Sequence, residues 1–135
     1  MSQDRAENMS PPASAMMISV TDHGAQEADL RDGWSQVLRL AFDDLDLVAF
    51  PEDGTLSYEG LTPMTEDQAG RLVDFVLENM SRSPRIVVHC KYGVSRSAGI
   101  AKAIAEALGV RFPSTYNEYN VFVYTEVLKQ FGAKM

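Results

Sequence analysis

The residues best suited to chemistry lie together in one short segment, residues 89–97, which reads His-Cys-Lys-Tyr-Gly-Val-Ser-Arg-Ser. Cys90 is the only cysteine of the chain, and Arg96 follows it six residues later. A thiolate is a strong nucleophile, and a guanidinium can hold two oxygens of an oxyanion at once. The pair therefore predicts nucleophilic attack on a group that carries oxyanion oxygens, such as a phosphoryl group.

The sequence on either side predicts that this segment joins a strand to a helix. Residues 86–88, Ile-Val-Val, are apolar and β-branched, which is typical of a buried strand in a parallel sheet. Small and aliphatic residues then recur at helical spacing as far as Leu108, and Gly109 suits the position just after a helix. Residues 90–95 should therefore form a loop whose amides, with the positive end of the helix dipole, face one anion-binding concavity.

Four residues of the segment have an expected chemical role. Nearby cations and a helix N-terminus lower the pKa of a cysteine from about 8.5 to as low as ~4, so Cys90 is expected to be a thiolate. The planar guanidinium of Arg96 can bind two equatorial oxygens of a phosphoryl group. Gly93 lets the backbone come close to that group. The hydroxyl of Ser97 is placed to donate a hydrogen bond to the sulfur.

The segment resembles the signature loop of the protein tyrosine phosphatase superfamily, in which His-Cys, five further residues and Arg-Ser surround the phosphate. Residues 93–99, Gly-Val-Ser-Arg-Ser-Ala-Gly, are most similar to the small dual-specificity branch. The resemblance extends from about Ile18 to Phe131. It implies hydrolysis of phosphate monoesters through a phosphocysteine, on phosphotyrosine alone or also on phosphoserine and phosphothreonine, with no metal or cofactor.

The resemblance also implies contacts to phosphate along the whole loop. The residues expected to bind it through backbone or side chain are Lys91, Tyr92, Gly93, Val94, Ser95 and Arg96. His89 is expected to hold the loop through hydrogen bonds of its ring rather than to act as a base. The side chains of Lys91 and Tyr92 are expected at the rim, where they either select the substrate or face solvent.

Such a phosphatase needs a proton donor for the leaving oxygen, and a positioned acid typically contributes about 10²–10⁴-fold. The superfamily supplies it from an aspartate in a loop after a strand upstream of the cysteine. Residues 37–42 predict such a strand, and Asp43, Asp44 and Asp46 follow it. The family's spacing, an apolar or aromatic residue, any residue and then Asp, favours Asp44, with Asp43 second and Asp46 third. The remaining aspartates would then be solvated or cap a helix.

Asp22 is a less favoured aspartate further upstream. It begins an Asp-His-Gly sequence that is similar to the acid loop of the larger tyrosine phosphatases but lacks their preceding Trp-Pro. The apolar run at residues 16–20 precedes it and is interpreted as an edge strand, so a surface turn would explain it. No catalytic role is expected for Asp22.

The rest of the chain predicts one α/β domain with a central, mostly parallel sheet and helices on both faces, because strands, loops and helices alternate. Thr65 and Gln68 form a capping box ahead of a helix that reaches about Met80, and a last helix is expected over residues 121–131.

Two segments are expected to lie outside that regular scaffold. Residues 1–15 are rich in Ser, Pro and charges and are expected to be a disordered lead-in, which leaves residues 16–135 as the phosphatase domain. Residues 50–63 form a long loop that either lines the substrate entrance or is a surface insertion.

The composition limits which binding partners and which cellular compartment are expected. The chain has 135 residues, 45% of them hydrophobic, which suffices for one core. A net charge of −7 argues against nucleic-acid partners and against an inositide-rich membrane surface. The chain has no apolar run of membrane-spanning length and no evident secretory signal, and its chemistry requires a free thiol. A monomeric cytoplasmic enzyme that acts on a phosphoprotein or a small phosphate is therefore expected.

Two alternatives remain open from the sequence. One is a catalytically dead module that only binds phosphate groups, although Cys90, Arg96 and Ser97 are all present. The other is the same chemistry on a nonprotein phosphate, such as a phosphoinositide, a nucleotide or an RNA end.

Overall fold

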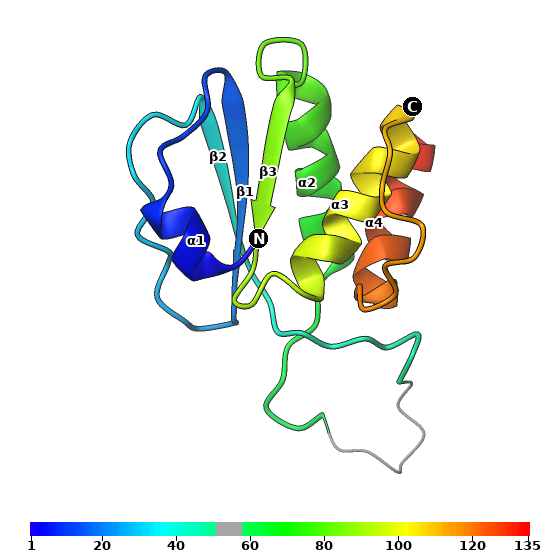
Figure 1. Ribbon diagram of the computed structural model, residues 1–135. Helices are drawn as coiled ribbons and strands as arrows, with labels where there is room; N and C mark the ends of the chain where they lie inside the picture. Colours follow the sequence, from blue (N-terminus) through cyan, green and yellow to red (C-terminus); the bar gives the residue numbers. More distant parts are fainter. Residues whose placement is uncertain (51–57) are drawn as a thin grey trace.

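The computed structural model of the chain describes residues 1–50 and 58–135 (Figure 1). Its elements, in chain order, are α1 (Gln3–Asn8), β1 (Ala15–Thr21), β2 (Gln36–Ala41), α2 (Glu66–Asn79), β3 (Arg85–His89), α3 (Arg96–Leu108) and α4 (Val121–Lys134). The predicted single α/β domain is confirmed. Residues 51–57, about half of the predicted long loop, lie outside the described residues. None of the helices found in the described ranges has the length and apolar character needed to cross a bilayer.

The three strands form an entirely parallel sheet in the order β2-β1-β3. Ser19 of β1 lies opposite Arg39 of β2 and opposite His89 of β3. Every residue of β1 is buried, as expected for a strand that is covered on both faces. The interpretation of this strand as an edge strand is therefore wrong, because its neighbours β2 and β3 are the outer strands.

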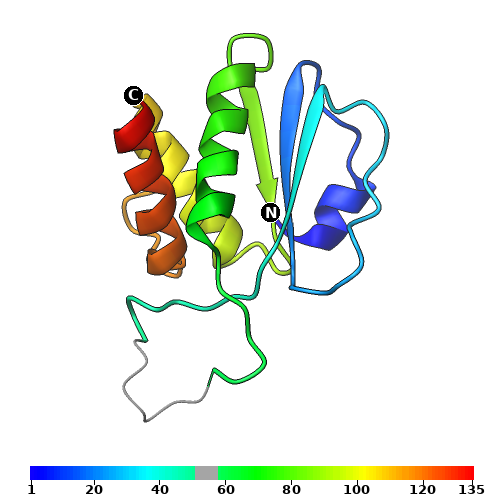
Figure 2. The ribbon, with the colours of Figure 1, turned by 180° about the vertical axis from the view of Figure 1, so that it is seen from behind.

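Helices cover both faces of the sheet, as predicted. Figures 1 and 2 show α1 on one face and α2 on the other, and α4 packs against both α2 and α3. Met16, Ile18 and Val20, at alternate positions of β1, join the core beneath α2, α3 and α4. The intervening residues of β1 face α1, where Ala6 is fully buried.

Helix caps fix the ends of the elements near the predicted site. The predicted capping box of α2 is present, with Thr65 Oγ1 accepting from the amide of Gln68 at 3.1 Å. The side chain of Gln68 also donates to the carbonyl of Ala41 at 2.9 Å, which ties α2 to the end of β2. Gly109 ends α3 with a φ of 71°, and Asn120 caps α4. The sequence therefore encodes where the helices begin and end.

The prediction that residues 1–15 are disordered is wrong. The side chain of Ser2 caps α1, and the extended residues before the helix pair with the end of β3. The amino group of Met1 donates to the carbonyl of Val88 at 2.8 Å, and the amide of Cys90 donates to the carbonyl of Met1 at 3.1 Å. Composition did not indicate this order because the segment is held by backbone pairing to a distant strand.

Candidate anion-binding site

The candidate site is the loop of residues 90–95, between the end of β3 and the start of α3. Gly93 has a φ of 73°, in the left-handed region that side-chain-bearing residues rarely adopt, so the loop can turn back there. A Cβ at this position would also lie 2.5 Å from the carbonyl carbon of Met1. The loop is therefore packed tightly against the first residues of the chain, and it needs glycine at this position.

Cys90 lies at the base of the loop and is only 2% exposed. Its Sγ is 3.1 Å from the Oγ of Ser97, in the first turn of α3. Burial raises the pKa of the thiol, but hydrogen bonds from the Ser97 hydroxyl and from the amides of Ser97 and Gly93, together with the charge of Arg96, outweigh it, so the pKa is lowered overall. The arrangement therefore favours a thiolate nucleophile.

Arg96 is 4% exposed and is held on one side of its guanidinium only. Its Nη1 donates to the carbonyl of Phe42 at 2.7 Å and lies 2.8 Å from Oδ1 of Asp22. Its Nε is buried and donates to no acceptor in residues 1–50 and 58–135. A buried donor without a partner is costly unless a ligand satisfies it, so this N–H is suited to an oxyanion.

Asp22 is a site residue that the sequence did not predict in this role. It follows β1, and the end of β1 lies beside the end of β3 because the two strands are parallel and in register at Ser19 and His89. The surface turn assigned to Asp22 is therefore at the site, where its carboxylate orients Arg96. A central position for β1 would have predicted this contact, because it places the residues after β1 beside the loop after β3. The interpretation of β1 as an edge strand did not predict it.

Two of the three aspartates after β2 are held by backbone amides. Asp43 accepts hydrogen bonds from the amides of His23 at 3.1 Å and Thr62 at 2.8 Å. Asp46 accepts hydrogen bonds from the first two amides of α4, at 2.7 and 3.0 Å, and thus completes the cap of that helix. Both side chains therefore fasten the loop after β2 to its neighbours.

Asp44 is the aspartate of this group that contacts the candidate loop. Its Oδ1 accepts hydrogen bonds from the Oγ of Ser95 at 2.8 Å and from the Nδ2 of Asn120 at 2.9 Å. The side chain is exposed, unlike those of Asp43 and Asp46. Asn120 also donates to the carbonyl of Leu45 at 2.9 Å, so the start of α4 holds this aspartate at the mouth of the loop.

His89 lies fully buried beneath the loop. Its Nε2 is 2.6 Å from the Oγ of Ser19 on β1, and its Nδ1 is 3.3 Å from the carbonyl of Cys90. Burial lowers the pKa of the imidazole despite the hydrogen bond to the Cys90 carbonyl, which favours the neutral ring. A neutral ring bonded to strand and loop holds the loop in place and lies away from the open side of the site.

The remaining loop side chains point outward. Lys91, Tyr92 and Val94 are exposed, and the Nζ of Lys91 lies 5.4 Å from the centre of the Tyr92 ring. Their backbone, rather than their side chains, is therefore in position to face a bound anion. The described residues contain no cluster of His, Cys, Asp and Glu that could hold a metal ion.

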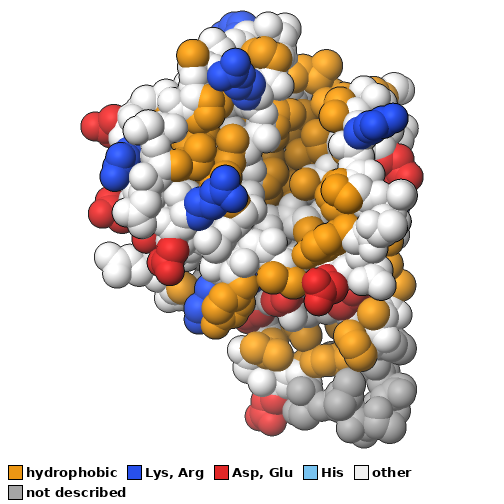
Figure 3. All heavy atoms as spheres, viewed as in Figure 1, with side chains coloured by type: hydrophobic (Ala, Val, Ile, Leu, Met, Phe, Trp, Pro, Cys, Tyr) orange, Lys and Arg blue, Asp and Glu red, His pale blue; other side chains and the backbone are white. Residues whose placement is uncertain are grey.

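A hollow of about 260 Å³ lies beside the loop, between β3 and α3. Figure 3 shows apolar side chains gathered in the hollow on this face. Its lining residues are Met1, Ile86, Val88, Gly93, Ser97, Ala98, Ala101, Phe112, Pro113 and Tyr116. Gly93 and Ser97 of the site line it, whereas Cys90 and Arg96 do not.

Comparison of the chain with protein-family models, with curated proteins and with solved structures finds no match. The function proposed below therefore depends on the residues and geometry of the site itself.

Proposed function

We propose that this chain is a cysteine-dependent phosphatase that hydrolyses phosphate monoesters through a phosphocysteine intermediate. One observation carries the proposal: a buried thiol with a lowered pKa and a buried guanidinium with an unpartnered Nε belong to the same strand–loop–helix segment. The helix N-terminus and the loop amides add further donors for an anion. Nucleophile and oxyanion donors at one place are the two requirements of thiolate attack on phosphorus.

In the first step, the Cys90 thiolate attacks phosphorus in line while Arg96 and the loop amides hold the equatorial oxygens. The S–P bond forms and the bond from phosphorus to the leaving oxygen breaks. Asp44, in its protonated form, gives its proton to that oxygen. The product alcohol or phenol then leaves a phosphocysteine behind.

In the second step, Asp44 acts as a carboxylate and takes a proton from water as the water attacks phosphorus. The S–P bond breaks, and the electron pair returns to the Cys90 sulfur. The Ser97 hydroxyl, 3.1 Å from that sulfur, stabilises the departing thiolate. Inorganic phosphate is released, and the two steps consume only the phosphate ester and water, without an oxidant, reductant or cofactor.

For the substrate we propose phosphotyrosine in proteins, with phosphoserine and phosphothreonine as further candidates. The exposed aromatic and aliphatic side chains of Tyr92 and Val94 at the rim support a substrate that presents an aromatic ring. Rates on matched phosphotyrosine and phosphothreonine peptides, and on a panel of phosphoinositides, nucleotides and other small phosphates, would separate these classes. A reducing compartment such as the cytoplasm would keep the thiol free.

The direct test compares the wild type with Cys90→Ser. The wild type should hydrolyse p-nitrophenyl phosphate, and Cys90→Ser should lose turnover by roughly 10³-fold or more, because an unactivated hydroxyl is a far weaker nucleophile. Binding of tungstate, measured by calorimetry, should persist in Cys90→Ser because the oxyanion donors remain. Full activity in Cys90→Ser would exclude the mechanism, whereas tungstate binding without turnover in the wild type would indicate a phosphate-binding module.

A further inference from the structure

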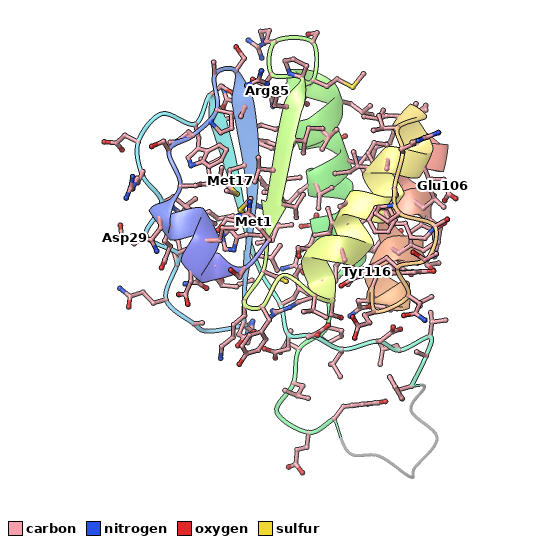
Figure 4. The ribbon with its side chains drawn as sticks, viewed as in Figure 1. Met1, Met17, Asp29, Arg85, Glu106 and Tyr116 are labelled. Carbon is pink, nitrogen blue, oxygen red and sulfur yellow. The ribbon has the colours of Figure 1, made fainter. Side chains whose placement is uncertain are left out.

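Several carbonyl groups of the candidate loop are held from outside the loop, among them those of Val94 and Lys91. The hydroxyl of Tyr116, in the segment between α3 and α4, donates to the carbonyl of Val94. The amide of Gln3, at the start of α1, donates to the carbonyl of Lys91 at 3.2 Å. Figure 4 shows Tyr116 near the start of α3 and Met1 near the end of β3, so the two donors approach the loop from different segments.

These outward bonds determine where the neighbouring amides point. In a trans peptide unit the C=O and the following N–H point in opposite directions. A Val94 carbonyl that is turned toward Tyr116 therefore directs the N–H of Ser95 away from Tyr116, toward the inside of the loop. The Lys91 carbonyl does the same for the N–H of Tyr92. Within the described part of the chain, neither N–H donates a hydrogen bond to another residue.

Tyr116 is itself firmly placed. Its ring meets Phe112 edge to face, with the centroids 6.1 Å apart, and its amide donates to the carbonyl of Pro113 at 3.2 Å. The Nζ of Lys102, on α3, lies 6.0 Å from the centre of the Phe112 ring and 5.2 Å from that of Tyr119, two aromatic residues of the same segment. These cation–π contacts fasten the segment to α3. Tyr116 is therefore held by the same helix whose N-terminus completes the loop.

We infer that Tyr116 is a positioning residue for the candidate site: by holding the Val94 carbonyl outward, it keeps the Ser95 amide directed at the bound oxyanion. The inference rests on the proposed function, since it concerns the same loop. Tyr116 acts on the anion through Ser95, because the hydrogen bonds to the sulfur come from Ser97 and Gly93. Desolvation, a neighbouring carboxylate and the charge of Cys90 raise the pKa of Tyr116, so the phenol stays neutral and its removal takes away no charge near the thiol. It should therefore control oxyanion affinity while leaving the reactivity of the thiol unchanged.

Tyr116→Phe tests this with two readouts. Removing the hydroxyl should weaken tungstate binding and raise KM for p-nitrophenyl phosphate by about threefold to tenfold, the range expected for one hydrogen bond. The pH dependence of Cys90 alkylation by iodoacetamide should stay as in the wild type. A merely structural role would shift both readouts or neither.

Tyr124→Phe is the matched control, because it also removes one tyrosine hydroxyl and its hydrogen bond, to Glu106, on the outer face of α3 and α4. It should leave tungstate affinity unchanged. If the wild type binds tungstate and Tyr116→Phe binds it equally well, the positioning role is refuted while the proposed function stands. If the wild type neither binds tungstate nor turns over substrate, both fail together. A Tyr116→Phe protein with a shifted alkylation profile would also overturn the inference, because it would show an effect on the sulfur.

Discussion

The guanidinium of Arg96 is fixed at one nitrogen and unpartnered at another. Nη1 is bonded to the Phe42 carbonyl and paired with Asp22, while Nε has no acceptor among the described residues. Donors that are already oriented need no reorganisation when charge develops on a substrate, and this preorganisation is a large part of electrostatic catalysis. At this scale the site is prepared by residues such as Asp22 that need not touch the anion themselves.

The identity of the general acid can be tested by separate substitutions of the aspartates after β2. Asp44→Asn should lower kcat on an alkyl phosphate by about 10²-fold or more, because a poor leaving group needs a proton. On p-nitrophenyl phosphate the loss should be much smaller, since that leaving group departs as the anion. Steady-state kinetics on the two substrates measure the difference.

Asp43→Asn is the control for Asp44→Asn, because Asp43 is held by the amides of His23 and Thr62. It should lower thermal stability and show no dependence on the leaving group. A leaving-group effect in Asp43→Asn and none in Asp44→Asn would reverse the assignment.

Ser97 should determine the acidic limb of the pH profile. Its hydroxyl and amide are the main causes that lower the pKa of Cys90 against the effect of burial. Ser97→Ala removes the hydroxyl, so the pKa of Cys90 should rise. The midpoint of iodoacetamide alkylation and the acidic limb of kcat/KM should both move to higher pH. Ser114→Ala, at an exposed serine, should leave the midpoint in place, and an unchanged midpoint in Ser97→Ala would contradict the assigned role.

The contacts that the sequence predicted at the site are the local ones, such as that of Ser97 with the Cys90 sulfur. Cys90, Gly93 and Ser97 belong to one segment between a strand and a helix, so spacing alone places them together. Asp22 and Tyr116 reach the same loop from other parts of the chain, through strand register and through a packed connection between helices. No pattern in a single sequence specifies such contacts, because they depend on which strands become neighbours.

Among the elements, the order of the strands explains how the site is assembled. β1 lies between β2 and β3, and all three run in the same direction, so their carboxyl ends share one edge of the sheet. The segments that follow them carry Asp22, Asp44 and Cys90. The strand and helix patterns predicted the individual elements because they depend on short-range periodicity and caps. They did not predict α1, which is six residues long, too short to be stable alone, and is preceded by Ser2, whose backbone pairs with Cys90 and Tyr92 just after β3.

Close packing of α3 against the start of α4 gives a prediction for Gly99. A Cβ at this position would lie 2.7 Å from the carbonyl oxygen of Asn120, a backbone atom that cannot easily move. Gly99→Ala should therefore destabilise the fold by roughly 1–3 kcal/mol, although alanine is the better helix former. It should also lower activity, because Asn120 holds both Asp44 and the Ser95 carbonyl.

Gly132→Ala supplies the matched control in a helix, since a Cβ there would meet nothing within 4 Å. It should stabilise the protein by up to about 1 kcal/mol through helix propensity. Urea unfolding of both variants measures the free energies. Stabilisation by Gly99→Ala equal to that of Gly132→Ala would show that the two helices are not in tight contact at Asn120.

For the whole molecule, the site lies where most of the chain converges. The loop after β3 and the start of α3 contact residues 1–3, the segments after β1 and β2, and the connection before α4. The cations Lys91 and Arg96 lie in this region of a chain whose net charge is −7. The loop of residues 89–97 has these two cations and no acid, although Asp22 and Asp44 lie against it. A short cationic loop in an acidic body favours a small anionic group over an extended polyanion.

This convergence predicts that an oxyanion stabilises the entire fold. The unfolded chain has no assembled loop, so a ligand at 100 times its Kd should add about 2.7 kcal/mol to the free energy of unfolding. For a chain of this size that corresponds to a rise in Tm of roughly 8 to 11 °C. Thermal unfolding of Cys90→Ser with and without tungstate, at constant ionic strength set with chloride, measures the shift.

Adding Arg96→Lys to the same protein keeps the charge but removes the planar guanidinium, so the increase in Tm should be markedly smaller. An equal shift in both proteins would mean that tungstate binds elsewhere, and a shift confined to a minor early transition would show that the site is not coupled to the sheet.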